Sequence, residues 1–105
     1  MELIRDFRAI NKGDSALAGG KGASLGEMTG ASIPVPPGYV ILSSAFERFI
    51  EETDLNVEID TILHSVNHQE MHTVDGASEK IQALILNAAM PKDIEKAIMT
   101  AYKKL

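Results

Sequence analysis

The sequence predicts an α+β fold that is mostly helical, with about five helices packed against a small sheet of two or so short strands. Two short runs in the first half, near residues 3–8 and 38–42, contain the apolar and β-branched residues of strands. The second half carries three apolar stripes at helical spacing. With 105 residues, the chain is expected to form a single domain, 1–105, with a modest core.

The first strand is expected at residues 3–8. The apolar spacing there fits either a strand or a helical turn, and we favour the strand. Residues 11–15 follow with the polar and glycine residues of a turn. The apolar anchors of the segment are Leu3, Ile4, Phe7 and Ile10.

A glycine-rich segment, Gly-Gly-Lys-Gly-Ala-Ser-Leu-Gly-Glu-Met, occupies residues 19–28. We expect a loop at 19–22 that leads into a short helix at about 23–29. Gly26 lowers the helix propensity of this stretch, so packing against the rest of the protein must hold the helix.

Residues 33–39, Ile-Pro-Val-Pro-Pro-Gly-Tyr, are expected to be extended. Each proline fixes its own φ and disfavours the α region for the residue before it. Pro37 and Gly38 suit the central positions of a type II turn. The apolar run around this turn predicts the second strand, at 38–42.

Helices account for the rest of the chain. Ser44 and Glu47 have the spacing of a capping box, which predicts a helix over about 44–52. Pro91 suits the first turn of the last helix, which has acidic residues near its start and lysines near its end. The three apolar stripes consist of Ile59, Ile62, Leu63 and Val66; of Ile81, Leu84, Ile85 and Ala88; and of Ile94, Ala97, Ile98, Ala101, Tyr102 and Leu105.

Composition argues against several classes of function. The net charge of −5, without a block of basic residues, argues against a nucleic-acid-binding surface. The absence of cysteine excludes disulfides, thiol catalysis and cysteine-ligated metals. No stretch approaches the roughly 20 apolar residues of a membrane span, and the N-terminus lacks the features of a signal peptide. We therefore expect a soluble, cytoplasmic protein that binds neither membranes nor nucleic acid.

The glycine-rich segment is the strongest candidate site. Gly20 and Gly22 would let backbone N–H groups approach an anion, and Lys21 would add a positive charge at a helix start, where anions are favoured. The alternative is a plain turn with a solvated lysine. The P-loop pattern would need glycine at 15 and serine or threonine at 22, and the Rossmann pattern would need glycine at 25. A phosphate site here would therefore belong to another fold.

Other polar groups are better explained by structural roles. His64, His68 and His72 lie four residues apart, but their surroundings do not form an H-E-x-x-H motif, so we expect solvated histidines and no metal site. Paired carboxylates such as Glu51 and Glu52 are expected on solvated helix faces. We assign no catalytic residue to this chain.

The motifs at residues 19–28 and 33–39 resemble the N-terminal start of the phosphoenolpyruvate synthase and pyruvate phosphate dikinase family. The resemblance continues through Ser-Ser-Ala-Phe at 43–46 to Phe49, and again over residues 90–105. It therefore covers essentially the whole chain.

This resemblance implies that the chain is the first subdomain of an ATP-grasp-like nucleotide-binding domain. In the family, ATP phosphorylates a histidine on a separate domain, and the phosphoryl group then passes to pyruvate. Lys21 would contact the ATP phosphates, while Gly20 and Gly22 would shape its loop. The magnesium ligands, the rest of the ATP-binding domain, the phosphohistidine domain and the pyruvate-binding domain are expected outside this chain.

The sequence departs from the family in lacking a Val-Arg-Ser-Ser-Ala-type motif before Leu105. We therefore expect that the isolated chain neither hydrolyses ATP nor transfers phosphate at an appreciable rate. Two other interpretations stay open. The chain could be a non-catalytic interaction module that self-associates through apolar helix faces, or a segment of a relative that phosphorylates an antibiotic or a glucan.

Overall fold

The structure, a computed structural model, describes residues 2–105. The chain divides into two compact units. The first unit comprises Met1–Arg48 and Pro91–Leu105, and the second comprises Phe49–Met90.

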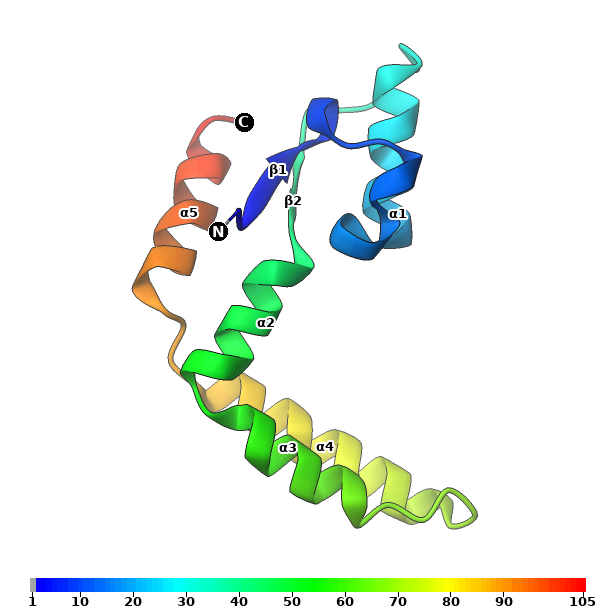
Figure 1. Cartoon of the computed structure of the whole chain (residues 1–105), viewed down its shortest axis with the longest axis vertical. Coiled ribbons are helices and arrows are strands. Elements are labelled where there is room, and N and C mark those ends of the chain that lie inside the picture. The colour runs from blue at the N-terminus through cyan, green and yellow to red at the C-terminus, as the bar shows by residue number, and fades with distance from the viewer. Residues whose placement is uncertain (1) are drawn as a thin grey trace. The chain divides into compact units, whose positions relative to one another are not determined.

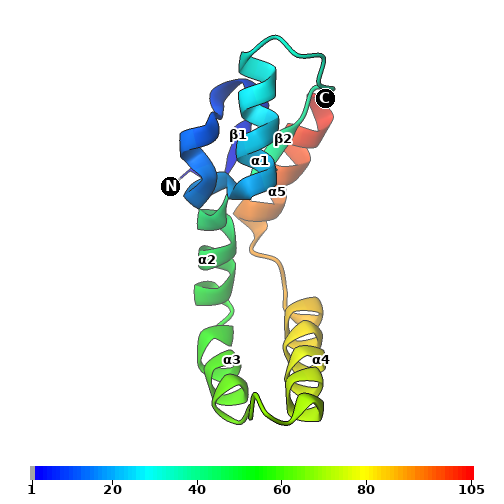
Figure 2. The same cartoon turned by 90° about the vertical axis from the view of Figure 1, so that its right-hand side faces the viewer.

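The first unit is built on a two-stranded antiparallel sheet in which Ile4 lies opposite Ile41 and Asp6 lies opposite Tyr39. Figures 1 and 2 show one helix on each side of this sheet, α1 beside β2 and α5 beside β1. In chain order the elements are β1 (Ile4–Asp6), two 3₁₀ turns (Phe7–Ala9 and Lys12–Asp14), α1 (Ser15–Gly30), β2 (Tyr39–Ile41), the first part of α2 (Ser43–Glu52) and α5 (Lys92–Lys103).

Hydrogen bonds between segments that are distant in the chain hold the first unit together. Leu42, which is 1% exposed, donates its N–H to the Leu3 carbonyl, and the Ser44 hydroxyl donates to the Glu2 carbonyl. These bonds tie the start of α2 to the strand at the N-terminus. The buried apolar side chains of this unit are Ile10, Ala23, Leu42, Ala45 and Ile94.

The second unit is a helical hairpin. The chain enters it through the end of α2, and its two further helices, α3 (Leu55–His64) and α4 (Met71–Asn87), pack against each other. The buried apolar residues of this unit are Phe49, Leu55 and Ala77, whereas Leu86 is 83% exposed. The hairpin therefore buries few of its apolar side chains.

The α+β prediction is confirmed, since the described residues form five α-helices and one small sheet. The three apolar stripes lie in α3, α4 and α5, with Val66, Ala88 and Leu105 just beyond the helix ends. α2 begins at Ser43, one residue before the predicted start, so Ser44 lies inside the helix and its hydroxyl bonds to the Glu2 carbonyl instead of capping.

Both strands are shorter than predicted. The first ends at Asp6 because its carboxylate accepts the Arg8 N–H at 2.9 Å and so caps a 3₁₀ turn over Phe7–Ala9. The second is confined to Tyr39–Ile41, within the predicted 38–42.

The predicted type II turn at Pro37 and Gly38 is wrong, because that turn requires a positive φ at Gly38 and this glycine has none. The Gly38 carbonyl instead accepts a hydrogen bond from the Phe7 N–H at 3.1 Å, and Gly38 lies against the Phe7 ring. A Cβ at position 38 would come within 2.6 Å of that ring. The glycine therefore serves close packing and not a turn.

Candidate functional site

The glycine-rich segment forms a kinked helix. α1 is interrupted at Gly19, whose φ of 76° and ψ of 166° are non-helical. Glycine adopts this positive φ readily, whereas other residues rarely do. The helix resumes at Gly20, so Gly20, Lys21 and Gly22 form a first helical turn and not the predicted loop, and the helix starts earlier than the predicted residue 23.

A helix start of this kind suits an anion. The backbone N–H groups of a first turn lack partners within their own helix, and the helix dipole favours negative charge there. Lys21 in this turn is exposed, and it forms no ion pair or side-chain hydrogen bond with any of residues 2–105. Its ammonium group is therefore available to a ligand.

The two predicted glycines of the site differ in their surroundings. Gly20 is exposed, and a Cβ added to it would meet no described atom within 4 Å. Gly22 is buried, and its added Cβ would lie 3.1 and 3.4 Å from the two Val40 methyl carbons and 3.2 Å from the Ala18 Cβ. Lys21 thus points to solvent beside a residue that faces β2.

Gly26, one turn after Gly22, makes a still closer approach. A Cβ there would lie 2.5 Å from the Ile10 carbonyl oxygen and 2.6 Å from the Ile10 Cβ. Because residues four apart share a helix face, both glycines lie on the face that packs against the rest of the unit. Tertiary packing therefore holds this stretch, as its low helix propensity requires.

Glu27 of the same motif has a structural partner that the sequence did not indicate. Its carboxylate accepts the Lys12 N–H at 3.0 Å, across 15 positions of the chain. The turn that contains Lys12 is itself closed by a reciprocal pair of bonds between Asn11 and Asp14. This turn holds Ile10 against Gly26, and no local pattern in the sequence could have revealed the pairing.

The charged groups near the N-terminus form small surface clusters. The pKa of Glu2 is lowered chiefly by its hydrogen bond from Arg5, which also lies 3.7 Å from Asp14. The pKa of Asp6 is lowered, first by the backbone N–H of Arg8 and then by the Arg8 side chain. These groups carry no arrangement for acid–base chemistry.

Within residues 2–105, no three His, Asp or Glu side chains lie close enough together to hold a metal ion. His64 lies at the end of α3, where its Nδ1 donates to the Asp60 carbonyl at 2.7 Å. His68 lies in the following loop and His72 in the first turn of α4. Within the same described range, no helix is both long and apolar enough to cross a bilayer.

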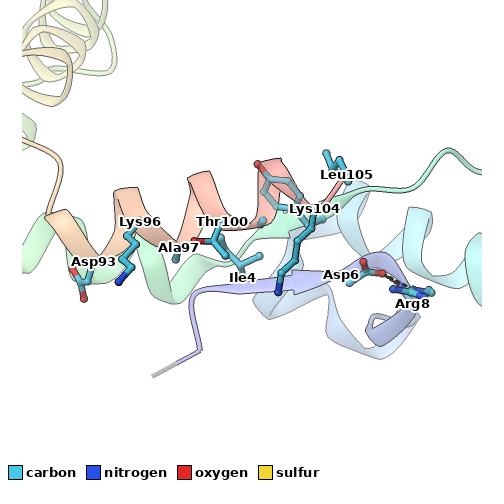
Figure 3. A pocket seen from close by; sticks show the side chains of 11 residues that line it. Ile4, Asp6, Arg8, Asp93, Lys96, Ala97, Thr100, Lys104 and Leu105 are labelled. Atoms are coloured by element: carbon cyan, nitrogen blue, oxygen red, sulfur yellow. Dashed lines mark hydrogen bonds and ion pairs between the residues drawn. The ribbon is translucent and has the colours of Figure 1, made fainter.

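A cavity of about 630 Å³ lies on the other face of the sheet, between β1 and α5. Figure 3 shows Lys96 of α5 and Lys104, just after the end of α5, directed toward it, with Ile4 of β1 on its opposite wall. Ile4 lies opposite Ile41, and Val40, the neighbour of Ile41 on β2, points to the other face of the sheet because successive residues of a strand alternate. Val40 faces Gly22 of α1, whereas Ile4 lines the cavity. The cavity is therefore separate from the Lys21 turn.

Comparison with known proteins gives a family match. Residues 15–105 match the family described as pyruvate phosphate dikinase, AMP/ATP-binding domain. The chain is 43% identical over all 105 residues to a protein of Methanocaldococcus jannaschii named probable phosphoenolpyruvate synthase, of which it covers 9%. It is 41% identical over 104 residues to a phosphoenolpyruvate synthase of Aeropyrum pernix, covering 98% of this chain and 13% of that protein.

A phosphoenolpyruvate synthase of Pyrococcus furiosus is 30% identical over 135 residues, which cover 98% of this chain and 16% of that protein. The chain thus spans less than a fifth of the length of these relatives. Its family match takes in α1 and every element after it, including the turn that carries Lys21. This chain belongs to the pyruvate phosphate dikinase AMP/ATP-binding domain family.

Proposed function

We propose that the chain is the N-terminal part of the nucleotide-binding domain of a phosphoenolpyruvate synthase-like phosphotransferase, and that the turn of α1 directly after the Gly19 kink, residues 20–22, contacts the phosphates of ATP. The observation that carries this proposal is the kink at Gly19: Lys21, which is exposed and has no partner among residues 2–105, lies in the first helical turn after it. The family's description as an AMP/ATP-binding domain supplies the ligand class.

The chemistry asked of this turn is electrostatic. The transferring phosphoryl group carries negative charge on its oxygens, and catalysis depends on positioning that group and stabilising its charge. Lys21 would supply a mobile point charge, and the N–H groups of the turn would hold the phosphate oxygens. Magnesium would neutralise further charge, through ligands outside this chain.

The proposed reaction moves the phosphoryl group in two transfers. It passes from ATP to a histidine on a separate domain of an ATP-grasp-like enzyme, and from that histidine to pyruvate. Neither acceptor is part of this chain, so its contribution is to bind and orient the donor. Half of a nucleotide cleft offers few contacts, and we expect weak ATP binding by the chain alone.

An amide chemical-shift titration tests the proposal. MgATP is expected to shift the resonances of residues 19–26, and Lys21→Ala is expected to abolish these shifts because it removes the only side-chain charge in the turn. Lys80→Ala, in the middle of α4, is the matched control and should leave the titration unchanged. Magnesium tripolyphosphate should shift the same amides, whereas adenosine should not.

Two results would refute the proposal. One is an MgATP titration without any shift at residues 19–26. The other is an identical titration curve for the wild-type chain and Lys21→Ala, since the shifts would then not depend on the lysine.

A further inference from the structure

We infer that Gly22 and Val40 form a positioning pair, in which the missing side chain of Gly22 fixes how closely α1 approaches β2 and therefore where Lys21 is presented. This inference rests on the proposed function, because it concerns the placement of the same lysine. It gives Gly22 a role at the packed face of the helix and not at the ligand.

The contact between the two residues leaves little room for a methyl group. A Cβ at position 22 would lie 3.1 Å from one Val40 methyl carbon, tighter than about nine in ten real contacts of this kind, and 3.4 Å from the other. It would also lie 3.2 Å from the Ala18 Cβ, which belongs to α1 itself. At this distance one of the neighbours must give way by a few tenths of an ångström, so either Val40 or α1 has to shift.

We expect the part of α1 next to the Gly19 kink to take up this shift, because the later part of the helix is held by the close approach of Gly26 to Ile10. Val40 is paired with Arg5 across the sheet, and Arg5 is bound to Glu2 and lies 3.7 Å from Asp14. α1, by contrast, meets Val40 of β2 through Gly22 and is kinked at Gly19, two residues before Lys21. A displacement of the helix thus acts on the one turn that carries the lysine.

Such a displacement matters because a shift of about 1 Å in a positioning group can cost about 100-fold in function. For the few tenths of an ångström required here, we expect Gly22→Ala to weaken MgATP binding about fivefold. Val40→Ala in the same chain removes the obstructing methyls but not the Ala18 contact within α1, and it is expected to restore part of the affinity. The lysine is untouched in every variant.

The test measures the MgATP dissociation constant from the amide shifts of residues 20–23 in folded protein. It compares the wild-type chain, Gly22→Ala, and Gly22→Ala combined with Val40→Ala. Gly26→Ala meets the Ile10 backbone carbonyl, so Val40→Ala should not rescue it. Gly30→Ala, at the open end of the same helix, should bind like wild type.

A purely structural role would lower stability but leave the affinity of the folded chain unchanged, and that result would overturn the inference. Equal failure to bind with and without Val40→Ala would overturn it as well, because the loss would not run through this contact. If the wild-type chain shows no MgATP-dependent shift, the proposed function fails and the inference fails with it. If the wild-type chain binds MgATP and Gly22→Ala binds it with the same dissociation constant, the inference fails while the proposed function stands.

Discussion

Substitution of Gly26 by alanine tests the packing that holds α1 in place. The new Cβ would lie 2.5 Å from the Ile10 carbonyl oxygen, about 0.9 Å inside ordinary van der Waals contact. Overpacking of this kind costs about 1–3 kcal/mol, and the higher helix propensity of alanine returns about 1 kcal/mol. Because the nearest atom is a backbone oxygen that cannot rotate away, we take the upper end of the overpacking range and expect a net loss of about 2 kcal/mol in the free energy of unfolding of the first unit.

Urea denaturation followed by tyrosine fluorescence is the appropriate assay. The chain has no tryptophan, and both tyrosines, Tyr39 and Tyr102, belong to the first unit, so their signal reports that unit. Each kcal/mol lost should also lower the melting temperature by about 4–8 °C for a unit of this size. Gly30→Ala, with no atom near its added Cβ, is expected to stay within about 0.5 kcal/mol of wild type. A Gly26→Ala chain as stable as Gly30→Ala would refute the close approach of Ile10.

Three further predictions follow from the surface of the molecule. Lys21→Ala should change the free energy of unfolding by less than about 0.5 kcal/mol, because the lysine has no partner among residues 2–105, and a larger loss in urea denaturation would show a hidden structural contact. The Arg8 N–H lowers the pKa of Asp6, so this carboxylate stabilises the folded state at pH values above its unfolded pKa of about 3.9. That stability is lost as the pH falls through the lower pKa of the folded state, and a carboxyl ¹³C titration that gives an ordinary or raised pKa would contradict this. The second unit exposes Met71 and Leu86, so sedimentation should show concentration-dependent self-association that Leu86→Lys weakens, and a monomer at all concentrations would exclude it.

Helix positions were predictable from the sequence because they depend on local periodicity. The stripes that begin at Ile59, Ile81 and Ile94 each lie in an observed helix. Propensity and capping act over a few residues, so sequence spacing alone carries the information. Boundaries were less accurate where a distant group intervened, as at Ser44, whose hydroxyl reaches the Glu2 carbonyl.

The glycines show why the remainder could not be predicted. A glycine can serve a positive φ, a close approach or a flexible loop, and the sequence does not distinguish these roles. Gly19 has the positive φ, Gly22 and Gly26 make close approaches, and Gly38 packs on a ring where a turn was expected. Each approach involves a residue that is distant in the chain, so no local pattern encodes it.

The candidate site was predictable as a set of residues but not as a geometry. The sequence indicated Gly20, Lys21 and Gly22, and the structure places all three in one helical turn after a kink. That the lysine faces solvent while Gly22 faces β2 depends on how α1 packs against the sheet. Whether the turn contacts phosphate stays a prediction.

Paramagnetic relaxation by MnATP tests the central claim most directly, because Mn²⁺ bound to the phosphates broadens only nearby resonances. The account predicts that the amides of residues 20–23 broaden first, and that Lys21→Ala removes this effect while Lys80→Ala preserves it. Mn²⁺ without ATP is the control for binding to acidic side chains. Broadening that is the same with Mn²⁺ alone, or that spares residues 20–23, would contradict the claim that this turn binds the phosphates of ATP.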